Sequence, residues 1–338
     1  QNTAIPDINF EKRLILMGID SGTPDGQVLT SKISGLTSLD VSDSSISDLT
    51  GIQAFKDLET LNCYSNQLTS LDLSQNKYLT TINCSRNAIT ALNTASNNDL
   101  RTLIASYNKL TVFSLTLNDK LRQLQINDNL IFSLIVSSAT SLEEIICDNN
   151  KLTFLNVTSN PALKSLSITD NQLSSIELKQ NPLLTSLSCW GNKLTVLDVS
   201  KNTALVSLYC DFNKITSLDL SKNINLVDFS CKSNSLNELN LNNGNNNKIN
   251  KTQLDLTNNP SLSCIKVDNP SYSTANWYAV SKDATANYSI DCNQTTLIPD
   301  ENFEKALIAL GYDSGTVDGK VLTSKINTIT SLFIYSKN

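Results

Sequence analysis

The chain has 338 residues, of which 40% are apolar and 17% are charged, so it can bury a core and is not a disordered tail. A net charge of −6 argues against a nucleic-acid-binding protein, because such proteins present a basic surface to the phosphates. The absence of histidine excludes catalytic systems that pair a serine or cysteine with histidine, and it excludes every metal site that contains histidine.

Residues 1–35 are predicted to form a small helical cap. Asp7 precedes a segment in which Phe10, Leu14 and Met17 recur on one helical face, and aspartate is a preferred residue immediately before a helix. A helix of this kind can cover the apolar end of a repeat array, which otherwise stays exposed to water. We therefore expect a capping helix at the start of the chain.

The turn from Asp20 to Gly26 follows this helix and contains aspartate and glycine at short spacing, as calcium loops do. However, Gly22 and Pro24 occupy places where an EF-hand requires oxygen-bearing side chains. We interpret the segment as a helix-to-strand turn. No other pattern in the sequence indicates a metal or a cofactor, and we expect neither.

Residues 36–267 form a periodic array. Leu61 and Cys63 alternate with polar residues, as a strand with one buried face requires, and Leu71 and Leu73 do the same on the opposite side of the coil. Stacked coils bury an apolar face that no single coil can bury, and parallel crossovers are right-handed. One unit of 22 residues starts at Leu36, and nine units of 21 residues then start at Leu58, Leu79, Leu100, Leu121, Leu142, Leu163, Leu184, Leu205 and Leu226.

The repeated motif L-x-x-L-x-L-x-x-N resembles the leucine-rich-repeat signature, and the 21-residue form resembles the short repeats of secreted Bacteroidetes proteins. The first cap and the first coil, SLDVSDSSISDLTGIQAFKDLETL, resemble the N-terminal caps of bacterial internalins. The pattern and the resemblance predict a right-handed leucine-rich-repeat solenoid. We expect it to be mostly β, with parallel strands on both flanks of each coil and small helical caps.

One asparagine recurs in every 21-residue unit. Its side chain carries two donors and an acceptor oxygen, so a buried stack can satisfy the backbone groups that are freed where each strand turns. We interpret the ladder as structural rather than as a polar channel for a ligand. Its members are Asn66, Asn87, Asn108, Asn129, Asn150, Asn171, Asn192, Asn213 and Asn234.

Six of the eight cysteines share one position of the repeat, which Ala105, Ile126 and Ile168 fill in the other coils. A position that accepts alanine, isoleucine or cysteine is an apolar core site, and a free cysteine behaves there as a small hydrophobic residue. We therefore expect free buried thiols rather than disulfides or a zinc site. They are Cys63, Cys84, Cys147, Cys189, Cys210 and Cys231.

The array ends less regularly than it begins. Residues 242–256 interrupt the 21-residue period and are predicted to form a protruding polar loop, and a final strand is expected at 262–267. Cys264 lies off the core position and Cys292 lies beyond the last repeat, so residues 268–293 are predicted to form a C-terminal cap that a disulfide closes. Such a link would stabilise the fold by ~3 kcal/mol and implies an oxidising, extracytoplasmic compartment.

Residues 294–338 are predicted to be a second copy of the N-terminal cap. The segment 298–326 matches residues 5–33 at 22 of 29 positions. We expect that this copy starts another repeat array and that the chain is one segment of a longer protein. The alternative is a degenerate C-terminal cap.

Candidate ligand-binding residues lie at the outward positions of the repeat, most of which are small and polar. Aromatic and acidic side chains interrupt this pattern, and they suit recognition because rings give contact area at low entropic cost and acids give polar anchors. The alternative is that single exposed aromatic residues are normal. The candidates are Trp190, Tyr209, Asp211 and Phe212, which we expect to form one patch, with Tyr107, Asp148 and Asp170 elsewhere on the same face.

We therefore expect a non-enzymatic, secreted or surface-displayed protein that recognises a protein partner through its exposed sheet, as the resemblance to internalins implies. One alternative is a carbohydrate-binding or matrix-adhesion module that stacks sugars on the aromatic residues, and another is a passive spacer. Paired acids could serve a glycoside hydrolase, but a solenoid of short coils has no deep cleft. No apolar run approaches the ~20 residues that span a bilayer, so we expect no membrane-spanning segment.

Overall fold

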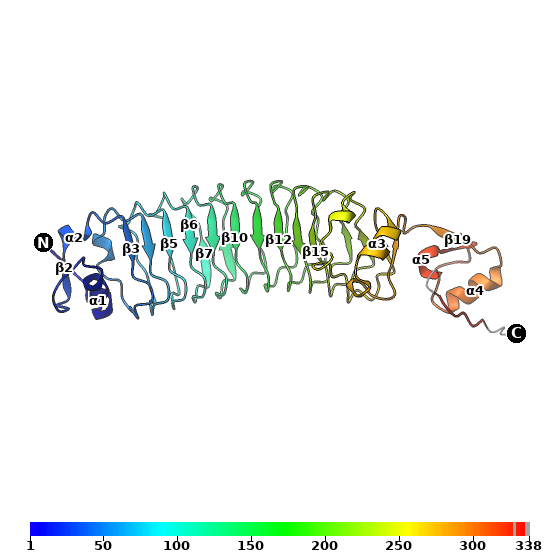
Figure 1. The fold of residues 1–338 in the computed structure, drawn as a ribbon, viewed down its shortest axis with the longest axis horizontal. Coiled ribbons are helices and arrows are strands. Elements are labelled where there is room, and N and C mark those ends of the chain that lie inside the picture. Colours follow the sequence, from blue (N-terminus) through cyan, green and yellow to red (C-terminus); the bar gives the residue numbers. More distant parts are fainter. Residues whose placement is uncertain (327–328, 335–338) are drawn as a thin grey trace. The chain divides into compact units, whose positions relative to one another are not determined.

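The computed structural model describes residues 1–326 and 329–334 (Figure 1). The chain divides into two compact units, Gln1–Leu194 and Thr195–Asn338. Unit 1 contains the first cap and most of the repeats. Unit 2 contains the last repeats, the disulfide-closed segment and the second cap.

The first cap of unit 1 combines a two-stranded sheet with two helices. Strand β1 (Asn2–Ala4) pairs antiparallel with β2 (Gln27–Leu29), and helices α1 (Ile8–Leu16) and α2 (Thr30–Ile33) pack beside them. Asp7 caps α1, because its Oδ1 accepts hydrogen bonds from the N–H groups of Asn9 and Phe10 at 2.8 and 3.0 Å. The expected capping helix is therefore present, although Met17 lies at its end and is partly exposed.

The first flank of unit 1 is a parallel sheet in which each coil contributes one strand of three residues. Paired residues are 21 apart from β4 onward, as in Leu61↔Ile82 and Leu166↔Leu187, so each apolar side chain stacks on its counterpart in the next coil. The middle residue of every strand is buried. The strands are β3 (Ser38–Asp40), β4 (Thr60–Asn62), β5 (Thr81–Asn83), β6 (Thr102–Ile104), β8 (Gln123–Gln125), β10 (Glu144–Ile146), β11 (Ser165–Ser167) and β12 (Ser186–Ser188). Parallel strands at the predicted period confirm the solenoid.

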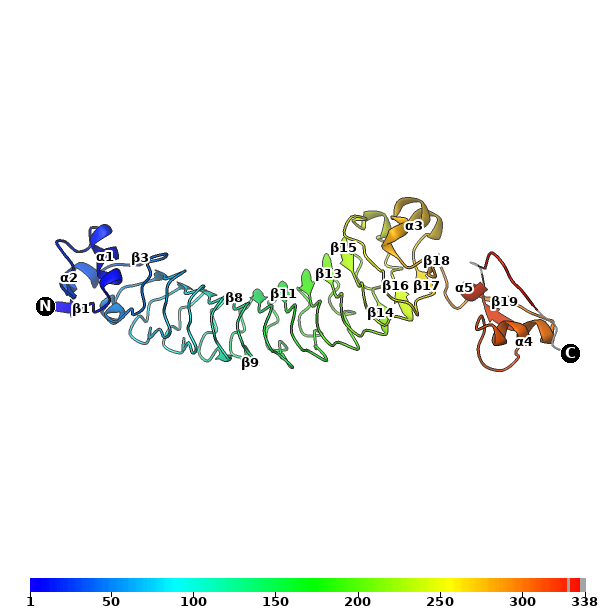
Figure 2. The ribbon, with the colours of Figure 1, turned by 90° about the horizontal axis from the view of Figure 1, so that it is seen from below.

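The second flank differs from the expectation of a strand in each coil. Within unit 1, strands occur there in two neighbouring coils, β7 (Val112–Ser114) and β9 (Ser133–Ile135), which pair in parallel. Figure 2 shows β9 on the side of the coils opposite β8 and β11. In other coils Asp72, Asn93 and Asn156 occupy this flank, and each accepts a hydrogen bond from the N–H group two residues further on. Such local bonds compete with strand pairing.

The asparagine ladder lies at the turn that follows each first-flank strand. In Asn150, Nδ2 donates to the carbonyl oxygens of Ile126, Cys147 and Asp148 at 3.1 Å each, and Oδ1 accepts from the N–H group of Ile131 at 2.9 Å. One side chain thereby satisfies backbone groups of two coils. The ladder side chains are buried from Asn108 onward, and those of Asn66 and Asn87 are half-buried.

A second asparagine ladder runs between the second flank and the next coil. Its side chains are fully buried, and each donates through Nδ2 to the preceding coil, as Asn97 does to the carbonyl oxygens of Leu73 and Asn76. Ala139 takes this position in one coil. This ladder was not predicted, although it has a sequence signal, N-x-x-L, in which the leucine is the first residue of the next unit. The asparagines are Asn76, Asn97, Asn118, Asn160, Asn181, Asn202 and Asn223.

Unit 2 continues the repeat and corrects the expectation of a protruding loop at 242–256. Strand β13 (Ser207–Tyr209) pairs in parallel with β15 (Asp228–Ser230), and Ser230 forms a further parallel bridge with Asp255. Leu254 and Leu256 are buried, and a short 3₁₀ helix spans Asn246–Lys248. Residues 250–259 are thus another coil of the array.

This additional coil also extends the first ladder. Nδ2 of Asn259 donates to the carbonyl oxygens of Cys231 and Leu256 at 3.1 and 3.0 Å, as the ladder asparagines of other coils do. The interval from Asn234 to Asn259 is 25 residues rather than 21. The longer interval hid the coil from a search at a fixed period.

The second flank of unit 2 is a four-stranded parallel sheet. Strand β17 pairs with β16 through Leu239↔Ile265, so the final strand expected at 262–267 is present and belongs to the second flank. A short helix, α3 (Pro270–Asn276), and a 3₁₀ helix (Ala279–Ser281) follow. The strands are, in spatial order, β14 (Ser217–Asp219), β16 (Glu238–Asn240), β17 (Cys264–Lys266) and β18 (Asn287–Ser289).

Cys264 and Cys292 form a disulfide with a Cα–Cα distance of 5.7 Å. The six repeat cysteines are free and buried. Burial raises the pKa of Cys84 to about 12, which keeps this thiol protonated and unreactive at neutral pH.

A thiol titration tests this arrangement. The folded, non-reduced protein should show no reactive cysteine, because the six free thiols are buried, and denaturation without reductant should release six thiols. Eight thiols after denaturation would contradict the disulfide, and fewer than six would mean that the repeat cysteines are bridged.

The second cap of unit 2 repeats the elements of the first. Strand β19 (Thr295–Leu297) pairs antiparallel with β20 (Lys320–Leu322), and helices α4 (Glu301–Ala309) and α5 (Thr323–Ile326) accompany them. Ile298, Leu307 and Val321 form its apolar core. Within the segment 294–338, which the sequence predicts to be this cap, residues 327–328 and 335–338 lie outside the described residues.

Candidate functional site

The seventh residue after each unit start lies in a tight turn. Three candidate residues occupy this position, so they lie in turns and not on the strands. Tyr107, Asp170 and Phe212 have φ values of 55°, 47° and 51°, in the left-handed region. They therefore project from the turn that ends each first-flank strand and not from the strand itself. Gly191 takes the same position in its coil with φ of 68°, and a Cβ there would lie 2.4 Å from Oδ1 of Asp170.

Asp148, Asp170 and Trp190 lie in three successive turns of unit 1. The N–H group of Asp170 donates to the carbonyl oxygen of Trp190 at 3.0 Å. Asp148 accepts hydrogen bonds from Oγ of Ser167 at 2.7 Å and from the N–H group of Thr169 at 2.8 Å. Burial and the nearby Asp148 carboxylate raise the pKa of Asp170. The structure thus brings an exposed indole and two carboxylates together at one edge of the first flank.

Tyr107 lies apart from this group, two coils from Asp148 and four coils from Trp190 in the direction of the N-terminus. Tyr107 is 47% exposed, and the guanidinium of Arg86 lies 4.8 Å from the centroid of its ring. The cation covers one face of the ring. Tyr107 is therefore a separate contact point and not a member of the Trp190 group.

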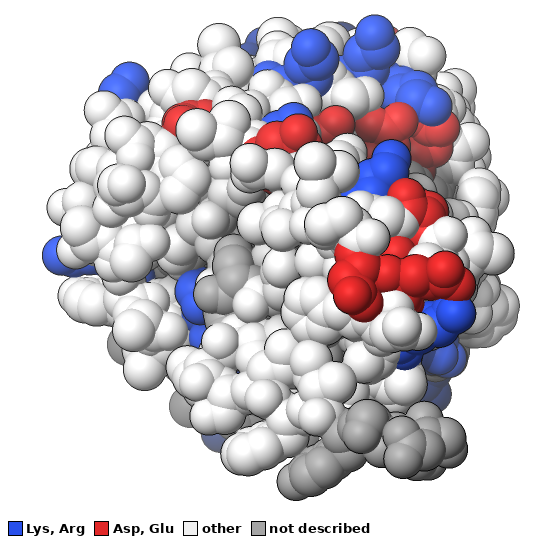
Figure 3. All heavy atoms as spheres, turned by 90° about the vertical axis from the view of Figure 1, so that its right-hand side faces the viewer, with Lys and Arg blue, Asp and Glu red and all other residues white. Residues whose placement is uncertain are grey.

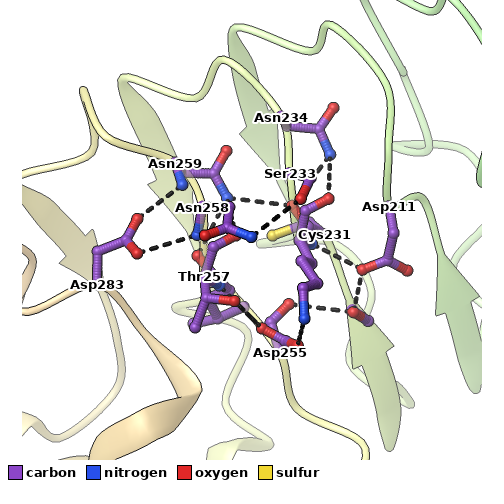
Figure 4. Close-up of polar contacts among 12 residues, drawn as sticks. Asp211, Cys231, Ser233, Asn234, Asp255, Thr257, Asn258, Asn259 and Asp283 are labelled. Atoms are coloured by element: carbon purple, nitrogen blue, oxygen red, sulfur yellow. Dashed lines mark hydrogen bonds and ion pairs between the residues drawn. The ribbon is translucent and has the colours of Figure 1, made fainter.

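In unit 2, Asp211 belongs to a polar network at the end of the first flank (Figure 4). Its Oδ1 accepts hydrogen bonds from Oγ of Ser230 and, at 2.7 Å, from the N–H group of Lys232. The Lys232 ammonium in turn pairs with Oδ2 of Asp255 at 3.1 Å. Both bonds to Asp211 end on Oδ1, so Oδ2 remains for a group that approaches from outside the network.

Asp211 lines an open pocket of about 430 Å³ beside the coil at 250–259. Tyr209, the last residue of β13, and Tyr278, from the segment after α3, contribute their rings, and the Lys251 ammonium lies 5.2 Å from the centroid of the Tyr278 ring. Asp255 completes the polar wall. Two rings, two carboxylates and one cation therefore surround a single hollow.

The pKa values of the two pocket carboxylates are shifted in opposite directions. Burial raises the pKa of Asp211, and the hydrogen bonds from Ser230 and Lys232 offset only part of this effect. Burial alone would also raise the pKa of Asp255, but hydrogen bonds from Thr257 and the Lys232 ammonium outweigh it and lower that pKa. Asp255 therefore stays charged, whereas Asp211 gains a proton more readily than an ordinary aspartate.

The structure joins some of the candidates and adds others. Tyr209 and Asp211 line one pocket, and Trp190 lies with Asp148 and Asp170. The expected patch of Trp190 with Tyr209, Asp211 and Phe212 spans residues of both units and stays a prediction. Sequence reasoning missed Lys251, Asp255 and Tyr278, and the one available signal was the L-D-L-x-x-N motif at 254–259, which marks the extra coil.

No protein-family model matches the chain. A segment of 75 residues, 22% of the chain, is 39% identical to Internalin J of Listeria monocytogenes and spans 8% of that protein. The solved functional domain of this internalin, which includes a cysteine ladder, matches with a TM-score of 0.60 and 30% identity over 79% of this chain and 66% of that chain. The chain is an internalin-like leucine-rich-repeat protein.

The internalin-like fold also extends to more distant proteins. The leucine-rich-repeat ectodomain of the receptor kinase GASSHO1/SCHENGEN3 from Arabidopsis thaliana, solved in complex with CASPARIAN STRIP INTEGRITY FACTOR 2, matches with a TM-score of 0.52. It is 18% identical over 70% of this chain and 30% of that chain, so the likeness concerns the fold alone. The Bacteroidetes-type origin and the secretion of this internalin-like protein stay predictions.

Within residues 1–326 and 329–334, no helix is long and apolar enough to cross a bilayer. The same residues contain no cluster of three or more cysteine, aspartate or glutamate side chains that could hold a metal ion. On the face drawn in Figure 3, Lys and Arg stand beside Asp and Glu, and most of the surface is uncharged.

Proposed function

We propose that this internalin-like protein is a secreted or surface-displayed, non-enzymatic binding protein that recognises a protein partner through its first flank. The outward side chains on this flank vary from coil to coil, whereas the buried ones repeat. In a solenoid the buried side chains stabilise the fold, and the variable exposed ones are available to bind a partner. The fold shared with the internalin domain supports this function. The Cys264–Cys292 disulfide supports an extracytoplasmic location, since disulfides persist in oxidising compartments.

The pocket around Asp211 carries the proposal. The half-buried Asp211 lines it together with Tyr209 and Tyr278. A lysine or arginine side chain of a partner can place its charge on Oδ2 of Asp211 and its aliphatic part against a ring, and charge-assisted bonds of this kind are among the stronger polar contacts. We therefore propose that the partner inserts a basic side chain here.

A glycan is the second candidate, and the same rings favour it. Tyrosine rings that line a polar pocket can stack on a sugar, while carboxylates accept hydrogen bonds from its hydroxyl groups. A protein pull-down and a glycan array, each with the full chain, distinguish the two candidates. No binding in either would favour a passive spacer.

Two substitutions test which residues bind the partner that these screens identify. Trp190→Ala and Asp211→Asn should each weaken binding by about 2 kcal/mol, roughly 30-fold, because each removes an anchor from the binding face. Tyr64→Ala, several coils from Trp190, is the control and should change affinity little. Equal affinities for all variants in isothermal titration would show that the partner uses another surface.

The pH dependence of binding tests the role of Asp211 separately. A basic side chain needs the ionised carboxylate, and the pKa of Asp211 is raised. Affinity should therefore fall as the pH is lowered, and this fall should start at a higher pH than for an ordinary aspartate. In Asp211→Asn this part of the pH profile should be missing. An unchanged profile would contradict a contact between the partner and Asp211.

A further inference from the structure

The two caps have the same internal structure. Ile5 N–H donates to the Gly26 carbonyl oxygen at 2.8 Å, and Ile298 N–H donates to the Gly319 carbonyl oxygen at 2.7 Å. The antiparallel register Asn2↔Leu29 recurs as Thr295↔Leu322. Each cap also buries a glutamate whose carboxylate accepts two backbone N–H groups: Glu11 from Asp25 and Gly26, and Glu304 from Asp318 and Gly319. The second cap is therefore an intact copy.

Asp7 and Phe10 are buried contacts through which the first cap docks on its coil. Oδ2 of Asp7 accepts hydrogen bonds from the N–H groups of Ser47 and Asp48 at 2.8 and 3.0 Å and from the Ser47 hydroxyl at 2.8 Å. Phe10 is fully buried and stacks on Phe55 with ring centroids 6.2 Å apart. Both partners belong to the first coil, residues 36–57. The docking face is thus one carboxylate oxygen beside one ring.

The second cap keeps these two side chains without a coil against them. Asp300 is exposed, and its Oδ1 accepts the N–H group of Phe303 at 2.8 Å, which is the helix-capping bond alone. Phe303 is half-buried against the core of its own cap. Asn302 also matches Asn9, which donates to the Ser45 carbonyl oxygen at 3.0 Å in the first cap, whereas Ala306 replaces Arg13.

Apolar side chains in the segment after the second cap are also exposed. Leu332 and Ile334 match Leu39 and Val41 of the first coil in sequence. Leu39 and Val41 are 1% and 0% exposed, whereas Leu332 is 38% and Ile334 is 48% exposed. These are core positions of a repeat strand, and burial of such side chains requires a neighbouring coil.

We propose that the second cap is a docking module for the first coil of a further leucine-rich-repeat array, which Asp300 and Phe303 bind as Asp7 and Phe10 bind residues 36–57. The first coil of a second copy of this chain does not fit, because its own first cap already covers it. The coil that binds the second cap must present two adjacent N–H groups, as Ser47 and Asp48 do, and an aromatic ring in the place of Phe55.

An extended chain tests the proposal directly. In this chain Ile334 is followed by a second copy of residues 42–194, so the second cap meets the coil that the first cap binds. Hydrogen exchange of Glu301–Ala309 should slow by at least about tenfold and approach the rate of Ile8–Leu16, because docking protects the helix from local opening. Unchanged exchange in an extended chain whose appended coils are folded would overturn the proposal.

Two matched controls make the result specific. In the appended copy, Ser47→Pro removes the N–H and hydroxyl donors that match those of Ser47 in the first coil and leaves the N–H group of Asp48. Phe55→Ala removes the ring that would face Phe303. Each change should reverse most of the protection. Neither change touches the second cap itself. Protection that both variants retain would contradict docking through Asp300 and Phe303.

If the appended coils do not fold, a variant that carries the sequence of the second cap in place of the first cap tests the proposal. In the original chain, the first cap receives the seven residues in which the copies differ: Ile8→Glu, Arg13→Ala, Leu16→Ala, Met17→Leu, Ile19→Tyr, Pro24→Val and Gln27→Lys. If the second cap has a functional docking face, the array should keep its urea midpoint and α1 its slow exchange. A midpoint as low as that of a variant with a disrupted cap would show that the second copy cannot dock.

Discussion

Replacing Phe10 with alanine should lower the free energy of unfolding by about 3–5 kcal/mol, the usual cost of truncating a buried phenylalanine. Phe10 is fully buried, and its ring stacks on that of Phe55, which is also fully buried. The substitution leaves a cavity between the cap and the first coil, and it exposes the end of the array that the cap covers. We therefore expect the largest loss of any single apolar substitution in the cap.

Phe303→Ala is the matched control for this prediction. It changes the equivalent ring in the second cap, where Phe303 is half-buried and packs within its own cap. Urea unfolding followed by far-UV circular dichroism should show a lower midpoint for Phe10→Ala and an unchanged midpoint of the repeat array for Phe303→Ala. Equal midpoints for wild type and Phe10→Ala would mean that the first cap unfolds independently and does not stabilise the coils.

The solenoid could be predicted because each coil repeats the same physical requirement. A strand with one buried face needs apolar side chains at fixed intervals, and Leu61, Leu166 and Leu187 meet that need in register. The first cap was visible for a similar reason, since Asp7 and Phe10 mark the start and the buried face of a helix. Patterns that packing imposes on every coil survive in the sequence.

Backbone conformation and variable coil length were less visible. Tyr107, Asp170 and Phe212 share a repeat position with Gly191, and only the φ values of the structure show that the position is left-handed. Arginine and serine also occupy this position, so the residue types did not predict a left-handed conformation. The coil at 250–259 escaped because four extra residues separate Asn259 from Asn234, although the hydrogen bonds of Asn259 match those of the other ladder residues.

The candidate site shows the same limit. Tyr209 and Asp211 could be selected from the sequence because they depart from a small, polar consensus. Lys251, Asp255 and Tyr278 could not, because they come from segments outside the strict period and reach the pocket through the extra coil and the turn after α3. A repeat register assigns faces within the array, but it assigns none to residues where the period changes.

Replacing Asn150 with alanine should lower the free energy of unfolding by about 1–3 kcal/mol through buried backbone groups left without partners. Its Nδ2 donates to three carbonyl oxygens and its Oδ1 accepts the N–H group of Ile131. Alanine satisfies none of these groups. Asn150→Asp should cost more than alanine, because aspartate can accept from Ile131 but places a carboxylate against the carbonyl oxygens of Ile126 and Cys147.

The exposed Asn98 provides the control, since Asn98→Ala changes the same residue type outside both ladders and should shift the urea midpoint little. We expect the highest urea midpoints for wild type and Asn98→Ala, a lower one for Asn150→Ala and the lowest for Asn150→Asp. This order would show that the donated bonds stabilise the coil. An Asn150→Asp midpoint at or above that of Asn150→Ala would contradict this, because it would mean that the bond accepted from Ile131 matters more than the three donated bonds. The comparison thus distinguishes the contribution of the donating Nδ2 group of Asn150 from that of its accepting Oδ1 atom.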